Sequence, residues 1–84
     1  MSYAQATMRY KGYIVTVKLI GNQIKIEAPI YWAKIWAKKQ LKKVAEDCKI
    51  DLTEADGNIF IGHRQIYEFE EKAIPMLKKC CKIV

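Results

Sequence analysis

The stretch Tyr13–Ala28, YIVTVKLIGNQIKIEA, predicts a β-hairpin around which the fold is built. Apolar and polar residues alternate with period two on both sides of Gly21-Asn22, as in two strands that each bury one face. Glycine at the first loop position accepts a positive φ, so a two-residue type I′ or II′ turn fits. This turn fixes the register of the buried face, which pairs Leu19 with Ile24, Val17 with Ile26, and Val15 with Ala28.

The other face of this hairpin carries Lys18 opposite Lys25, and Thr16 opposite Glu27. Two lysines directly opposite each other on a β-ladder repel one another mildly. Water tolerates such a pair, and an anion would benefit from it. We therefore include Lys18 and Lys25 in a predicted binding surface for an acidic partner.

The segment Ile30–Lys49, IYWAKIWAKKQLKKVAEDCK, predicts a helix that begins after Pro29. A narrow stripe at helical spacing forms its core face, and this stripe consists of Ile30, Ala33, Ala37, Leu41, Val44 and Cys48. The first two turns carry more apolar surface than one core face can hold. The surplus residues, called the aromatic patch below, are Tyr31, Trp32, Ile35 and Trp36.

If fully exposed, the aromatic patch would cover on the order of several hundred Å², which monomers usually avoid. The sequence allows four possible covers for this patch: residues 1–8, the second helix, a second copy of the chain, or another protein. Tryptophan often anchors protein interfaces. We therefore predict an interface here, in a homodimer or in an inhibitor or adaptor that docks on an acidic protein surface.

The rest of the chain predicts further strands and a second helix. Residues 4–10 form a strand that turns at Lys11-Gly12, and Ile50 and Leu52 add a short extended piece. Asp56-Gly57-Asn58 has turn chemistry, and residues 58–61 read as a short strand buried on both faces. From about Arg64 a helical stripe returns, formed by Ile66, Phe69, Ala73, Leu77, Cys80 and Val84.

Pro75 falls opposite that stripe, where a kink does least harm, or it starts a new helix. The predicted class is therefore α+β, in the order β-β-β-α-β-α. We expect a small antiparallel sheet, made of the hairpin and one or two further strands, with two helices packed on one face. Residues 1–84 form a single compact domain, because two domains would each be too small to hold a core.

The charge of the chain is segregated along the sequence. Residues 1–49 hold ten basic against three acidic residues, residues 50–71 one against six, and residues 72–84 four against none. A basic first half suggests an acidic partner, most commonly nucleic acid. Excess lysine also serves solubility alone, and helix dipoles account for part of the segregation.

The sequence lacks the patterns that carry catalysis or hold a cofactor. No phosphate-binding glycine loop occurs, the single histidine, His63, has no nucleophile near it in sequence, and zinc-type CxxC or HxxxH pairs are missing. We expect no enzyme activity, metal, cofactor or small-molecule substrate. The odd number of cysteines argues against a disulfide framework and favours the reducing cytoplasm.

No apolar run approaches the roughly 18 residues of a membrane span, and the N-terminus does not resemble a signal peptide. These observations predict a small, basic, non-enzymatic binding protein of the cytoplasm, viral or regulatory in role, with no membrane partner. Lysines interleaved with aromatic residues suit nucleic acid. The predicted contacts for nucleic acid or an acidic protein are Lys18, Lys25, Lys39, Lys42 and Lys43; the alternative is the protein interface on the aromatic patch.

Overall fold

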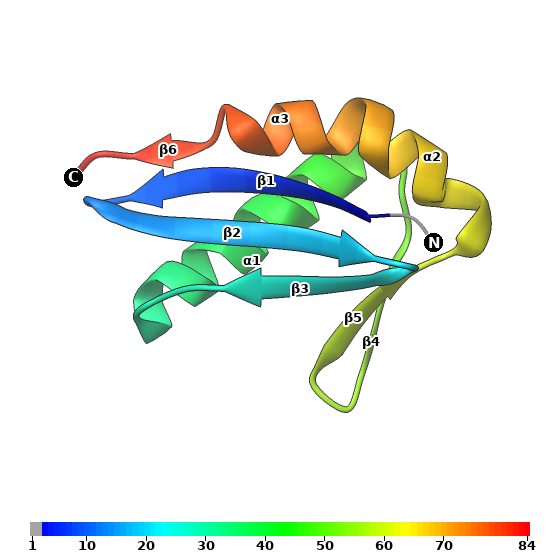
Figure 1. Ribbon diagram of the computed structural model, residues 1–84, viewed down its shortest axis with the longest axis horizontal. Coiled ribbons are helices and arrows are strands. Elements are labelled where there is room, and N and C mark those ends of the chain that lie inside the picture. Colours follow the sequence, from blue (N-terminus) through cyan, green and yellow to red (C-terminus); the bar gives the residue numbers. More distant parts are fainter. Residues whose placement is uncertain (1–2) are drawn as a thin grey trace.

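The computed structural model describes residues 3–84 and shows an α+β fold, with helices on one face of a mixed sheet (Figure 1). The predicted class and the packing of helices on one face are thus confirmed. The strands lie in the order β4-β5-β3-β2-β1-β6. The elements are β1 (Tyr3–Tyr10), β2 (Tyr13–Ile20), β3 (Gln23–Glu27), α1 (Tyr31–Asp47), β4 (Leu52–Ala55), β5 (Asn58–Ile61), α2 (Ile66–Glu68), α3 (Ile74–Lys78) and β6 (Cys81–Lys82).

The central hairpin has the predicted register, with Leu19 paired to Ile24 and Lys18 to Lys25. Its ladder ends at Thr16 and Glu27, so the expected pair between Val15 and Ala28 lies beyond it. Gly21 has a φ of 63°, whereas Asn22 is not among the residues with positive φ. This combination selects the type II′ turn from the two that the sequence allowed.

The sheet has more strands than predicted, because β4 and β6 carry little apolar signal. β4 has only one residue that is not fully exposed, yet it forms a hairpin with β5 through Asp56-Gly57, where both residues have positive φ. β6 pairs with β1 in parallel over two residues, so the sheet is mixed and not purely antiparallel. The predicted order β-β-β-α-β-α matches the observed order in outline, with these two strands added.

The expectation that β5 is buried on both faces was also wrong. Ile59 and Ile61 are buried, whereas Asn58 is exposed and Phe60 is only half-buried. The reason is the layering: α1 and the segment α2–α3 lie on the same side of the sheet (Figure 1). The opposite side, called the open face below, is uncovered by any element of residues 3–84.

The second helical segment runs from His63 to Lys78 and contains a π-helix at Phe69–Ala73. The amide of Ile74 donates to the carbonyl of Phe69, a five-residue step that directly precedes Pro75. Pro75 lacks an amide hydrogen, and its ring would clash with a carbonyl four residues earlier in a regular helix. The wider turn accommodates the proline, as π-bulges do at helix irregularities.

The predicted core stripes account for most of the packing between the helices and the sheet. Three residues of α1, Ala33, Ala37 and Leu41, are fully buried, as are Phe69 and Leu77 of the second segment. The expected extension of the second stripe to the end of the chain was wrong, because α3 ends at Lys78 and Val84 is 89% exposed. No helix within residues 3–84 is long and apolar enough to cross a membrane.

Candidate nucleic-acid interface

The five lysines predicted to bind an acidic partner lie on two opposite sides of the molecule. Lys18 and Lys25 project from β2 and β3 onto the open face, because their neighbours in each strand face the core. Lys39, Lys42 and Lys43 lie on the exposed surface of α1, which covers the other side of the sheet. One surface cannot contain all five, so the predicted site divides into two.

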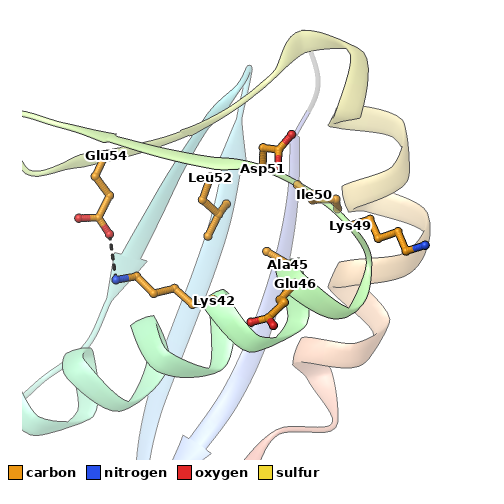
Figure 2. A pocket seen from close by; sticks show the side chains of 8 residues that line it. All are labelled: Lys42, Ala45, Glu46, Lys49, Ile50, Asp51, Leu52 and Glu54. Atoms are coloured by element: carbon orange, nitrogen blue, oxygen red, sulfur yellow. Dashed lines mark ion pairs between the residues drawn. The ribbon is translucent and has the colours of Figure 1, made fainter.

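On α1, part of the lysine charge is already balanced within the molecule. The Glu54 carboxylate of β4 forms ion pairs with the ammonium groups of Lys42, at 3.3 Å, and Lys38, at 3.4 Å. Figure 2 shows the pair with Lys42. Hydrogen bonds from Lys42 and then Lys38 lower the pKa of the Glu54 carboxyl. Lys39 and Lys43 are exposed and form no ion pair with any residue of the described range 3–84.

An open hollow of about 650 Å³ lies between the end of α1 and β4 (Figure 2). Acidic and basic side chains alternate around it, with no group of one sign that would select an anion or a cation. Within residues 3–84, no three His, Cys, Asp or Glu residues gather in a way that could hold a metal ion. The lining residues are Lys42, Ala45, Glu46, Lys49, Ile50, Asp51, Leu52 and Glu54.

The aromatic patch is divided by the fold. Tyr31 and Trp32 are 69% and 65% exposed and meet edge to face, with ring centroids 5.4 Å apart. Ile35 and Trp36 are half-buried, and the Trp36 ring packs on Tyr10 at 5.3 Å. The cover of Trp36 is therefore intramolecular and comes from the end of β1.

The surface that the sequence did not reveal as a unit is the open face. Strand pairing places Tyr3, Ile20, Gln23 and Phe60 in one row across β1, β2, β3 and β5. Tyr3 is 56% exposed, and Ile14, near the other end of the face, is 54% exposed. The next row holds Gln5, Lys18 and Lys25, followed by Thr7, Thr16 and Glu27, and then by Arg9 and Ile14.

The open face is basic. It carries Arg9, Lys18 and Lys25, and Glu27 is the one acid among the described strand residues that point to this side. The ammonium of Lys18 lies 2.9 Å from the Glu27 carboxylate, and this hydrogen bond raises the pKa of Lys18. The contact also relieves the repulsion between Lys18 and Lys25, so the paired lysines are stable on a solvent-exposed surface.

A signal for this surface was present in the sequence. Tyr3, Phe60, Ile14 and Ile20 stand at positions of their strands where the alternation calls for polar residues. The alternation that identified the hairpin could not show that these four residues share one face, because that depends on how β1 and β5 pair with β2 and β3. 

The three thiols and the histidine differ in their exposure to solvent. Cys48 and Cys80 are half-buried, and desolvation is the main cause that raises the pKa of each thiol. Cys81 and His63 are exposed. Comparison with known proteins adds no assignment: no family model, curated protein or solved structure matches this chain.

Proposed function

We propose that the protein binds single-stranded nucleic acid on the open face of its sheet. The observation that carries the proposal is the row of Tyr3, Ile20 and Phe60 beside the row with Lys18 and Lys25, on a face that no described element covers. Bases stack on aromatic side chains, and phosphates pair with neighbouring cations. A single nucleic-acid strand that crosses the sheet can make both kinds of contact.

The spacing of the aromatic residues suits a strand laid across the sheet. Tyr3 and Phe60 lie on strands separated by β2 and β3, so their backbones are about 14 Å apart at the usual ~4.8 Å spacing. They provide two separate stacking positions, and Ile20 supplies an apolar contact between them. Polar side chains in the same and the next row, such as Gln5 and Gln23, are available for base edges.

The shape of the face disfavours duplex DNA. The four strands of the aromatic row span about 14 Å between their backbones at the usual ~4.8 Å spacing, whereas the major groove is about 12 Å wide and admits a helix or a two-stranded ribbon. The open face is therefore too broad to enter a groove. The nucleic acid that binds there must therefore present unpaired bases.

The first experiment measures binding of a fluorescent oligonucleotide of about ten nucleotides, single-stranded or duplex, by anisotropy. For single strands, a plot of log K against log salt concentration has a slope of about −0.7 for each phosphate in contact with a cation. Three such contacts give a slope of roughly −2. Affinity should then fall about 20-fold between roughly 50 and 200 mM salt. Absence of single-strand binding at about 50 mM salt would refute the proposal.

A second experiment assigns the surface by charge reversal. The double variant Arg9→Glu, Lys25→Glu should abolish measurable binding. The matched control, Lys39→Glu with Lys43→Glu, changes the same amount of charge on α1 and should weaken binding only slightly. Loss of binding in the control alone would place the ligand on α1, which carries three of the five lysines predicted from the sequence.

We also propose self-association through the exposed part of the aromatic patch as a second function, since Tyr31 and Trp32 remain uncovered within residues 3–84. Light scattering should detect a dimer that Trp32→Ala weakens while the circular dichroism spectrum is unchanged. If the protein is a monomer and gains size only with an acidic partner protein, the patch serves a docking module instead. A monomer whose Trp32 fluorescence no such partner alters would exclude both versions.

A further inference from the structure

A cleft of about 230 Å³ opens where β5 separates from β3. The two strands pair only at Gln23–Phe60 and Ile24–Ile59, after which the β4–β5 hairpin diverges from β3 (Figure 1). The cleft adjoins the open face at Lys25 and extends toward α1. Its lining is Ile24, Lys25, Ile26, Glu27, Lys34, Lys38, Gly57, Asn58 and Ile59.

The separation leaves main-chain groups of β3 pointing into this cleft. The amide of Ile61 donates to the carbonyl of Asn22 at 2.9 Å, and Ile24 pairs with Ile59 two residues further on. In an antiparallel ladder, alternate residues direct their N–H and C=O groups to the same side. The next residue in this series is Ile26, whose N–H and C=O therefore face the cleft beyond the end of the ladder.

The side chains around the cleft combine apolar and cationic character. Ile24, Ile26 and Ile59 form apolar walls, and Lys25 and Lys34 stand at its rim. Within residues 3–84, neither Lys25 nor Lys34 has an ion pair, whereas Lys38 is held by Glu54. Glu27 is likewise held by Lys18, so the unbalanced charge at the cleft is positive.

We infer that this cleft binds one unstacked base of the single strand, with the adjoining phosphate on Lys25 and Lys34. The inference rests on the proposed function and deepens it. The Ile26 N–H and C=O form a donor–acceptor pair that matches the edge of a base. Ile26 and the buried Ile24 and Ile59, whose side chains lie on the helix side of the sheet, offer an apolar contact to one face of the ring. The nucleic acid continues onto the open face past Lys25.

The size of the cleft agrees with this occupant. At ~30 Å³ per water, 230 Å³ holds about eight waters, and a base has about eight to eleven non-hydrogen atoms that bonding packs more closely. An added peptide strand fits less well. Because β3 ends at Glu27 and Pro29 follows, its free edge offers only the N–H and C=O of Ile26 as a complete donor–acceptor pair. A peptide that adds to a sheet as a new strand needs several such pairs.

The test compares Lys34→Glu with Lys39→Glu in the anisotropy experiment with the ten-nucleotide strand. Both residues are exposed on α1, but only Lys34 lines the cleft. Lys34→Glu should lower affinity about five-fold or more and reduce the salt slope by about 0.7, the value for one phosphate. Lys39→Glu should leave both quantities near those of the unmodified protein.

A second measurement observes the backbone directly. In ¹H–¹⁵N spectra, titration with the four nucleoside monophosphates should shift the Ile26 amide most for the base whose edge complements it. If the oligonucleotide binds but Lys34→Glu behaves like Lys39→Glu and the Ile26 amide is unmoved, the cleft inference is overturned while the proposed function stands. If the unmodified protein does not bind the oligonucleotide at all, the proposed function fails and the inference fails with it.

Discussion

The contact between Trp36 and Tyr10 predicts that the two tryptophans of α1 contribute unequally to stability. Trp36 is half-buried and packs on Tyr10 with ring centroids 5.3 Å apart, whereas Trp32 is 65% exposed. Removal of the Trp36 ring also uncovers the end of β1. We therefore expect Trp36→Ala to destabilise the fold and Trp32→Ala to leave it nearly unchanged.

The size of the effect follows from the surface involved. A tryptophan buries about 150–250 Å² when packed, and the lower figure, at ~25 cal/mol/Å², corresponds to about 4 kcal/mol. The alanine retains part of this burial, and the unfolded chain is not fully exposed. A loss of about 2–3 kcal/mol remains, of which ~1 kcal/mol belongs to the aromatic pair.

Thermal unfolding followed by circular dichroism measures this difference. For a domain of this length, 1 kcal/mol corresponds to roughly 4–8 °C, so Trp36→Ala should lower Tm by about 10–20 °C. Trp32→Ala should change the free energy of unfolding by less than ~0.5 kcal/mol. A double-mutant cycle with Tyr10→Leu and Trp36→Leu should give a coupling of ~1 kcal/mol.

Two results would refute this reasoning. Equal Tm shifts in Trp36→Ala and Trp32→Ala, measured at a protein concentration at which light scattering detects a monomer, would mean that the packing of Trp36 on Tyr10 adds no stability. A coupling energy near zero between Tyr10 and Trp36 would mean that their rings do not pack against each other.

Three further changes have defined outcomes. Phe60→Ala should weaken oligonucleotide binding by about 1–3 kcal/mol, the value of one stacked base; unchanged affinity in the anisotropy assay would remove Phe60 from the interface. The lowered pKa of Glu54 means that its stabilising pairs are present above the ordinary value of 4.5 and are lost as pH falls through the folded-state pKa. Glu54→Gln should accordingly lower Tm at neutral pH and match the unmodified protein at pH 2, and a difference that persists in acid would contradict the ion-pair explanation. Iodoacetamide should alkylate exposed Cys81 before Cys48 and Cys80, because burial raises the pKa of these two thiols. Peptide mass mapping that finds Cys48 modified first would contradict the packing of α1 on α3.

The sequence predicted those elements whose apolar residues repeat with a regular period. The hairpin around Gly21 and the buried stripe of α1 emerged with the right register and the right buried face. Of β4, only a short extended piece at Ile50 and Leu52 was predicted, because one face of the strand meets the lysines of α1 and the other meets water, so no alternation marks the rest of it. β6 was missed because a two-residue strand has no period at all.

The candidate site was less predictable for a related reason. Periodicity shows which face of an element is buried, but it does not show which faces of different elements share one surface. Lys18 and Lys42 therefore looked like parts of one basic site, although Lys18 points to the open face and Lys42 lies on α1, on the other side of the sheet. Tyr3 and Phe60 looked unrelated, although strand pairing places them in one row.

The parallel pairing of β6 with β1 also bears on the order in which the chain folds. Arg9 pairs with Cys81, so this contact closes nearly the whole length of the chain, whereas β1, β2 and β3 are joined by two-residue turns. Local contacts cost little chain entropy, and a long closure must wait for the structure that repays it. The three-stranded meander, which carries most of the open face, can thus form early, and the C-terminal strand joins it last.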